Sequence, residues 1–308
     1  MPEKLFRVLS LDGGGAKGFY TLGILREIES LIGCALHERF DLIYGTSTGA
    51  IIAAMLSLGK SVKEIQGVYT THVPTVMKES SAADKSRALT TLSEEVFGAA
   101  KFEEVKTNIG IVATRWILER PMIFKANIAQ AHGSKASFAP GFGVKIGDAV
   151  QASCSAYPYF DRKLVVTEKG DRVELIDGGF CANNPTLYAI ADATIFMAMP
   201  PERIRVVSLG VGTYPPPKLG IFSWDHWKNK TPGVQLLQKT LEINTQSMDQ
   251  LREVMFKHVP TVRISQSFSE PAMATDLFEH DLNKLNILTQ RGVQSFAENE
   301  EVLKTYLL

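Results

Sequence analysis

The sequence predicts an α/β fold in which a mostly parallel central sheet is sandwiched between helices. Two short apolar runs, at residues 5–11 and 40–45, each end in a glycine-containing turn and lead into an apolar segment of helical character. A strand that passes through a tight turn into a helix is the repeating unit of parallel sheets. Further strands are expected as far as residue 211, and helices after that point, so we expect a helical C-terminal cap.

The first strand, LFRVLSL, ends at Asp12, and a helix follows the glycines because apolar residues recur at helical spacing from Ile24 to Ile32. The second strand, FDLIYG, is followed by the apolar run AIIAAML, which opens another helix. The later elements are expected in this order: a loop or weak helix at 80–100, two strands within 107–126, a long loop at 127–143, strands at 173–177 and 203–211, and an apolar helix at 185–198 between them.

Residues 214–233 differ from the rest, because they hold four prolines and two of the three tryptophans. An amphipathic helix is expected at 237–255, where apolar residues recur at spacings of three and four. Further helix is expected in the last thirty residues, interrupted at Gly292. We therefore divide the chain into a core at 1–213 and an extension at 214–308 that packs on the same domain.

Composition excludes several classes of protein. The 33 basic and 33 acidic residues cancel, so charge gives no reason to expect a nucleic-acid polymer as partner. Three cysteines are too few for a disulfide framework. Charged residues within the first twelve positions interrupt any signal-peptide core, and no uncharged apolar stretch reaches the length of a spanning helix. We expect a soluble, cytoplasmic chain.

Residues 45–49, GTSTG, stand between an expected strand and an expected helix. Gly-x-Ser-x-Gly in that setting is typical of a nucleophile elbow, whose turn is so tight that the flanking residues must be small. Ser47 would project from the turn, where the N-terminus of the helix favours negative charge. The structural alternative is a glycine-lined turn whose serine only caps the helix.

Three glycines, Gly13, Gly14 and Gly15, lie in another loop between strand and helix, DGGGAKG. Without side chains in the way, their N–H groups can converge on an oxyanion, and one such donor is typically worth about 10²–10³ in rate. Gly13, Gly15 and Gly18 also satisfy the G-x-G-x-x-G pattern of dinucleotide-binding loops. That pattern requires an acidic residue at the end of the second strand, which here carries GTSTG instead.

A third motif, DGGFCANNP at 177–185, follows another expected strand. Asp-Gly-Gly and Asn-Asn-Pro are both turn formers, and alone the motif more often marks a turn than a base. In combination with GTSTG, it indicates that Asp177 is the base for Ser47, held by the glycine turn and the asparagines.

The three motifs, in this order, resemble those of the patatin-like phospholipases: a DGGGxxG loop, a GxSxG elbow and a later DGG aspartate. The segments QASCSAYPYF, NNPTL and VVSLGVG also match, although Tyr157 stands where an alanine is usual. The resemblance covers about residues 5–213 and leaves the Pro/Trp-rich segment and the C-terminal helices unassigned.

The resemblance implies a patatin-like fold and a Ser47–Asp177 dyad that needs no histidine, metal or cofactor. Asp177 would take the hydroxyl proton as Ser47 attacks an ester carbonyl, and an acyl-enzyme would form. The amides of Gly13, Gly14 and Gly15 would stabilise both tetrahedral intermediates. The implied substrate is a membrane glycerophospholipid or related acyl lipid, which the enzyme would meet peripherally at the lipid interface.

Two other classes of function stay open. An α/β-hydrolase lipase or esterase would place a histidine after Asp177, and His226, His258 and His280 are candidates, although none lies in a glycine-rich loop. A nucleotide-binding regulator would use the loop at 13–18 and would show no esterase activity.

The size and plan of the chain also resemble bacterial patatin-like effectors that a cyclic nucleotide switches on in antiviral signalling. The implied activator would order the loops at 80–100, 127–143 or 214–233, or would drive formation of a homo-oligomer through the helix at 237–255. In the simpler alternative, that helix packs on its own core and the loops only shape an acyl channel.

Three further residues have two interpretations each. Lys17 either steers a lipid phosphate or is a solvated lysine in a first helical turn. Trp224 and Trp227 either dock at a lipid interface, where indoles are favoured, or pin a proline-rich loop to the body of the protein.

Overall fold

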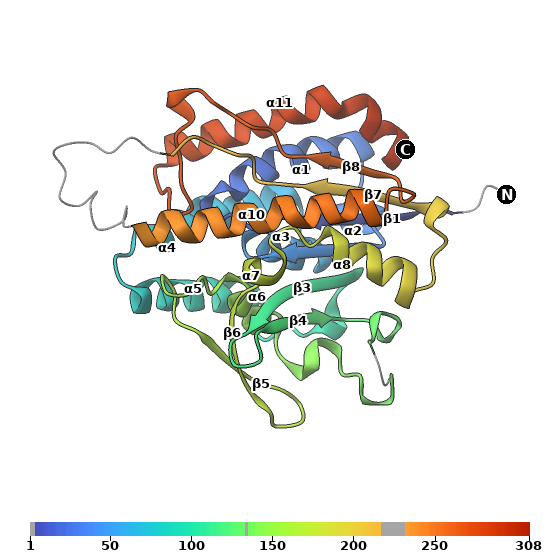
Figure 1. Ribbon diagram of the computed structural model, residues 1–308, viewed down its shortest axis with the longest axis horizontal. Helices are drawn as coiled ribbons and strands as arrows, with labels where there is room; N and C mark the ends of the chain where they lie inside the picture. Colours follow the sequence, from blue (N-terminus) through green and yellow to red (C-terminus); the bar gives the residue numbers. More distant parts are fainter. Residues whose placement is uncertain (1–3, 133–134, 217–231) are drawn as a thin grey trace.

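The computed structural model describes residues 4–132, 135–216 and 232–308. An eight-stranded sheet runs through the molecule with helices on both sides (Figure 1). The strands are β1 Phe6–Leu11, β2 Leu42–Thr46, β3 Asn108–Arg115, β4 Arg120–Lys125, β5 Lys163–Val166, β6 Arg172–Asp177, β7 Ile204–Leu209 and β8 Thr261–Ile264. The helices are α1 Gly18–Ile32, α2 Leu36–Arg39, α3 Thr48–Ser57, α4 Val62–Lys78, α5 Ala82–Phe97, α6 Ile146–Cys154, α7 Gly179–Ala182, α8 Thr186–Ala191, α10 Pro232–Met255 and α11 Leu282–Leu307.

The strand order is β5-β6-β3-β2-β1-β7-β8, and β4 also pairs with β3. The pairs that join β3, β2, β1, β7 and β8 are parallel, whereas β4, β5 and β6 pair antiparallel. The predicted fold class, a mostly parallel sheet between helices, is confirmed. The C-terminal part is not purely helical, because it contributes β8 to the edge of the sheet beside β7.

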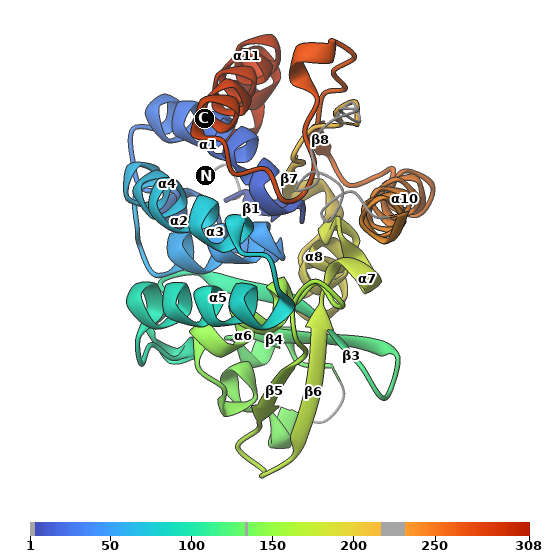
Figure 2. The ribbon, with the colours of Figure 1, turned by 90° about the vertical axis from the view of Figure 1, so that its left-hand side faces the viewer.

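Strand β1 shows how both faces of the sheet are covered. Leu9 and Leu11 point into one core with residues of α1, α3 and α4, whereas Val8 points into a second core with Tyr44 and Ile190. This alternation is the period of two expected of a strand that is buried on both faces. Helices α1 to α6 lie on one side of the sheet and α7, α8 and α10 on the other (Figure 2).

The segment at 80–100, expected as a loop or weak helix, contains the regular helix α5. Ser81 caps its N-terminus by accepting a hydrogen bond from the backbone N–H of Asp84. Helix α10 confirms the amphipathic pattern at 237–255. None of the helices in the described ranges has the length and apolarity needed to cross a bilayer.

The expected interruption at Gly292 is wrong, because α11 continues through it. Gly292 lies where α11 crosses α1, 3.1 Å from Gly23 Cα when measured from an ideal Cβ position. A side chain there would overlap the carbonyl oxygen of Tyr20. The glycine therefore permits close packing of two helices and does not end one of them.

Candidate active site

The carboxyl ends of β2 and β6 meet on one edge of β3. Thr46, the last residue of β2, pairs with Val112, and Asp177, the last residue of β6, pairs with the next residue, Ala113. Because β2 is parallel and β6 antiparallel to β3, the two strands approach each other from opposite directions. Ser47 directly follows Thr46, so the sheet brings Ser47 and Asp177 together.

Ser47 lies in a constrained turn between β2 and α3. Its φ of 52° and ψ of −122° are unusual for a residue with a side chain. A Cβ on Gly45 would overlap the carbonyl oxygen of Gly49, and a Cβ on Gly49 would overlap that of Leu11. The two glycines of the motif are therefore required by the close approach of backbone, as in a nucleophile elbow.

The backbone of this turn is held by a serine that sequence reasoning did not single out. The Ser47 N–H donates to Ser153 Oγ at 2.8 Å, and Ser153 Oγ donates to the Val112 carbonyl at 2.5 Å. Ser153 lies in α6, within the QASCSAYPYF segment, and is fully buried. It links the elbow to β3 and fixes the height of the Ser47 hydroxyl above the sheet.

Asp177 is almost fully buried, with 1% of its surface exposed. The N–H of Gly179 donates to its Oδ1 at 2.7 Å. Burial raises the pKa of Asp177 to about 7, and hydrogen bonds from Gly179 and from the Ser47 side chain act in the opposite direction. A carboxyl group with this pKa, in contact with a hydroxyl, can both accept and return a proton near neutral pH.

The glycine loop lies against the same site. Gly14 and Gly15 line the cavity that contains Ser47 and Asp177. The N–H of Gly13 instead donates to the carbonyl of Asn183 at 2.9 Å. A Cβ on Gly14 would lie 2.5 Å from Val211 Cγ2, and Gly15 has a φ of 58°, so both positions favour glycine.

Asp12, the first residue of the loop motif, has a structural partner. Its carboxylate is paired with the guanidinium of Arg263 in β8, which also donates to Ser208 Oγ at 2.9 Å. The backbone N–H of Asp12 donates to the carbonyl of Leu209 at 3.0 Å. Arg263, which belongs to the C-terminal part without recognised motifs, therefore holds the start of the glycine loop. No local sequence signal could have identified this role of Arg263.

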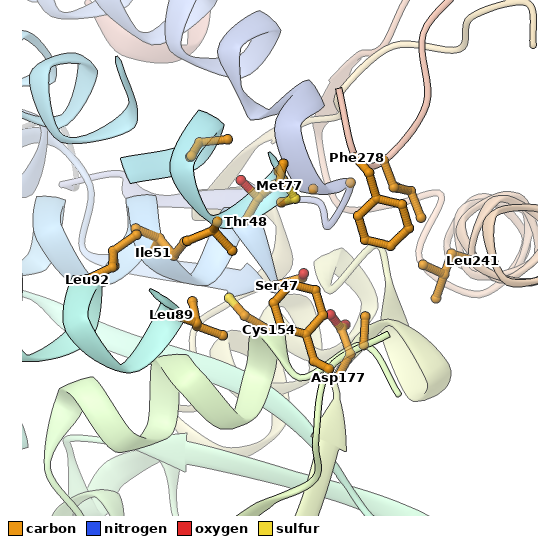
Figure 3. A pocket seen from close by; sticks show the side chains of 17 residues that line it. Ser47, Thr48, Ile51, Met77, Leu89, Leu92, Cys154, Asp177, Leu241 and Phe278 are labelled. Carbon is orange, nitrogen blue, oxygen red and sulfur yellow. The ribbon is translucent and has the colours of Figure 1, made fainter. Parts of the chain in front are cut away.

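The cavity around Ser47 is narrow and apolar, with a volume of about 50 Å³. Figure 3 shows Ser47 and Asp177 side by side within it. Apolar side chains from both parts of the chain form the other walls, among them Ile51, Leu89, Leu92, Leu241, Leu277 and Phe278. Such a lining suits an acyl chain and excludes water from the reacting groups.

The structure brings no histidine of its described ranges into this cavity: His258 and His280 are absent from the lining. His226, Trp224 and Trp227 lie outside the described residues. In the part of the chain that the structure describes, no group of three or more His, Cys, Asp or Glu residues is placed to hold a metal ion. The geometry around Ser47 therefore gives no support to a Ser-Asp-His triad.

Comparisons with known proteins agree with this geometry. The chain matches the family model of the patatin-like phospholipases over residues 9–190. It is 60% identical to the cUMP-AMP-activated phospholipase of Escherichia coli over 306 residues, which cover 99% of this chain and 95% of that protein. It is 28% identical to the cGAMP-activated phospholipase of Vibrio cholerae, over 67% of this chain and 64% of that one.

Among solved structures, VipD from Legionella pneumophila matches with a TM-score of 0.51 and 12% identity, over 99% of this chain and 67% of that one. This similarity supports the fold alone. The family match covers more than half of the chain and contains all three motifs. The chain therefore belongs to the patatin-like phospholipase family of hydrolases.

Proposed function

We propose that this chain is a phospholipase A-type enzyme in which Ser47 is the nucleophile and Asp177 the general base. The observation that carries the proposal is the meeting of β2 and β6 on β3, which puts a strained serine against a buried carboxyl group in an apolar cavity. The substrate is a fatty-acyl ester of a membrane glycerophospholipid.

The reaction needs these two side chains and one water molecule. As Ser47 Oγ bonds to the ester carbonyl carbon, its proton passes to the Asp177 carboxylate, which returns it to the departing lysophospholipid oxygen. Water then attacks the acyl-enzyme, gives its proton to Asp177, and the fatty acid leaves as Ser47 recovers a proton. A pKa of about 7 allows Asp177 to act in both directions.

Gly14 and Gly15 line the cavity, so we assign their backbone N–H groups as the oxyanion donors of this mechanism. The amide of Gly13 is engaged with Asn183, so we assign Gly13 to anchoring the loop. The expectation of three equivalent donors is thereby narrowed to two, with the third glycine in a supporting role.

We further propose that a cyclic dinucleotide switches the enzyme on, as an effector of antiviral defence. Two relatives are described as activated by cUMP-AMP and by cGAMP. A cavity of about 50 Å³ is far smaller than the 300–1,000 Å³ or so that drug-sized ligands occupy. In this proposal the walls of the cavity move before an acyl chain enters, and the nucleotide promotes that movement.

The lipid interface would be met from the cytoplasmic side by the turn between β3 and β4. Trp116, Ile117 and Leu118 project there with 40%, 76% and 49% of their surfaces exposed. The guanidinium of Arg162 lies 5.1 Å from the centre of the Trp116 ring. Aromatic and aliphatic side chains beside a cation are typical of surfaces that dock on anionic lipid.

Residues 214–308 and residues 1–213 form a single domain in this proposal. Pairing of β8 with β7, packing of α11 on α1 and the contact between Arg263 and Asp12 all support it. Exposed apolar side chains along α10, including Leu236, Ile243 and Val254, provide a surface through which activated copies would associate.

The experiment is fatty-acid release from phospholipid vesicles, with and without cyclic UMP–AMP, followed by mass spectrometry of the products and by sedimentation. We expect release only with the nucleotide, and none from a Ser47→Ala variant that is purified in parallel. High release without nucleotide, from a species of constant size, would contradict control by a nucleotide. Release by the Ser47→Ala variant would contradict the proposed chemistry.

A further inference from the structure

A second cavity, with a volume of about 480 Å³, adjoins the first. Gly14, Leu241 and Leu277 line both cavities, whereas Ser47 and Asp177 line only the first. The second cavity lies between the glycine loop and α10, and polar side chains form much of its wall. Its volume lies in the range of about 300–1,000 Å³ that is usual for small-molecule sites.

Lys17 is a buried cation in this wall; within the described residues its salt bridge is a long one, and its Nζ also lies 5.9 Å from the centre of the Tyr214 ring. The side chain of Lys17 is 3% exposed, and its Nζ lies 3.8 Å from Glu242 Oε1, which is beyond a direct hydrogen bond. Asp276 also acts on Lys17 electrostatically. Glu242 has closer partners elsewhere, at 3.2 Å from Lys239 Nζ and 2.9 Å from Gln238 Nε2. An incoming anion could therefore bind Lys17 more closely than Glu242 does.

A second buried polar group in the same wall is Asn183. It is 6% exposed, and no residue of the described ranges donates a hydrogen bond to its Oδ1. Its Nδ2 donates to the Gly13 carbonyl at 3.2 Å and to Thr245 Oγ1 at 2.7 Å, and its backbone N–H donates to Asn244 Oδ1 at 2.8 Å. Asn183 thus links α10 to the glycine loop while one of its own acceptors stays unsatisfied by the described residues, at a cost in free energy.

We propose that this polar cavity is the site for the activating cyclic dinucleotide, with one phosphodiester on Lys17 in place of Glu242. The inference rests on the proposed function. The amide side chains of Gln246 and Gln250, which also line the cavity, suit the donor and acceptor edges of the bases. A lipid headgroup carries the same phosphodiester chemistry, but it offers no bases for these amides.

The shared walls explain how the ligand would open the active site. Glu242 and Leu241 are adjacent on α10, so displacement of the carboxylate moves the helix that carries a wall of the apolar cavity. The hydrogen bonds of Asn183 pass the same movement to Gly13 and hence to the glycine loop. A ligand that binds better when α10 is displaced shifts the equilibrium toward the open cavity.

The test blocks the cavity from an exposed position. Ser247 lines it and Thr240 does not, and both are exposed residues of α10. We expect Ser247→Trp to raise the half-activating concentration of cyclic UMP–AMP by about tenfold or more, measured by hydrolysis of a soluble ester and by calorimetry. Thr240→Trp, the matched control, should stay within about twofold of the wild type.

A second variant tests the sign of the charge effect. Glu242→Gln removes the carboxylate that competes for Lys17, so the half-activating concentration should fall by about threefold or more. A purely structural role for Glu242 would not improve activation. The proposal is overturned if Ser247→Trp activates like the wild type, or if Glu242→Gln raises the concentration required.

The remaining outcomes separate this site from the proposed function. If cyclic UMP–AMP neither binds nor activates the wild type, the proposed activation by a nucleotide and the proposed nucleotide site are both wrong. If it activates the wild type, Ser247→Trp and Glu242→Gln equally, only the proposed site is wrong. If Ser247→Trp changes the KM for phospholipid vesicles but not the nucleotide response, the cavity is a headgroup site and the proposal fails.

Discussion

The two cavities that share Gly14 differ in almost every other respect. The one around Ser47 holds about 50 Å³ and is lined mainly by apolar side chains, whereas the one beside α10 holds about 480 Å³ and has many polar and charged residues in its lining. The narrow cavity lies at the strand ends of the sheet, where the pairing of β2 and β6 with β3 positions Ser47 and Asp177. The wide one is bounded by α10, the glycine loop, Asn183 and the segments that follow β7 and β8.

This difference suits the two cavities to different roles: catalysis in the cavity around Ser47 and regulation in the cavity beside α10. A reacting pair must be held within a fraction of an ångström, which a sheet edge achieves and a lone helix does not. A regulatory ligand must instead find a wall that can move, and α10 is attached near the site through Asn183. Substitutions confined to one cavity should therefore leave the function of the other unchanged.

The largest effect is expected at the dyad. Ser47→Ala and Asp177→Asn should each lower kcat for a soluble ester by about 10⁴–10⁶, and the double variant should be little worse, because the two residues act as a unit. Calorimetry should show unchanged binding of cyclic UMP–AMP, since neither residue lines the polar cavity. A Ser47→Ala enzyme that keeps a tenth of the wild-type rate would refute the assignment.

Gly14 lines both cavities, so a side chain there should affect both of them. A Cβ would lie 2.5 Å from Val211 Cγ2, and the loop must shift to relieve the overlap. Gly14→Ala should lower kcat by about 10²–10³, the usual contribution of an oxyanion donor, and should change the half-activating nucleotide concentration. Gly67→Ala in α4, where a Cβ meets open space, is the control. An unchanged kcat would remove the loop from the mechanism.

The pH dependence tests Asp177 alone. Its pKa is raised to about 7, and the base works as the carboxylate, so kcat/KM of the activated enzyme should rise with pH through about 7 and be about 100-fold lower at pH 5. A profile that is flat between pH 5 and 8 would exclude Asp177 as the base.

The same pKa predicts the stability of the Asp177→Asn variant. Because the folded state holds the proton more tightly than the unfolded chain, the stability contributed by Asp177 is present below its ordinary pKa and is lost as pH rises through about 7. The variant should therefore be more stable than the wild type at pH 8, by at most about 4 kcal/mol, with no gain at pH 4. Thermal melts at the two pH values measure this gain.

The motifs of the narrow cavity could be predicted because tight turns leave local signals. Gly45 and Gly49 lie where two backbone segments approach too closely for a side chain, so the turn needs glycine at both positions. This need for glycine appears in the sequence as the GTSTG motif. Asp177 is the last residue of a strand, so its position followed from the pattern as well.

The residues that support the site leave no such signal. Ser153 and Arg263 act through partners more than 40 residues away in the chain, and nothing beside them marks the role. Strand β8 has four residues, too few for a reliable alternation, and its place beside β7 depends on tertiary pairing. The interruption expected at Gly292 is wrong for the same reason. The residues of α1 that Gly292 contacts are far away in the sequence, so a local pattern gives no sign of them.

The smallest effect is expected at the turn between β3 and β4, which belongs to neither cavity. Trp116 lies three residues beyond Ala113, the partner of Asp177, and therefore about 10 Å farther along the strand. If this turn docks on lipid, Ile117→Asp should lower hydrolysis of anionic vesicles by about tenfold. Hydrolysis of a soluble ester and the half-activating concentration of cyclic UMP–AMP should both stay unchanged.

A matched control lies outside the hairpin, in the helical turn Asp192–Phe196. Ile195 is 63% exposed, close to the 76% of Ile117, and follows Asp192, whose carboxylate pairs with Lys125 at the end of β4. Ile195→Asp introduces the same charge in place of the same side chain, so any general effect on stability or on repulsion from anionic lipid appears in both variants. Equal losses on vesicles would mean that the turn has no special role in docking, and a loss on the soluble ester would mean that it acts on the fold.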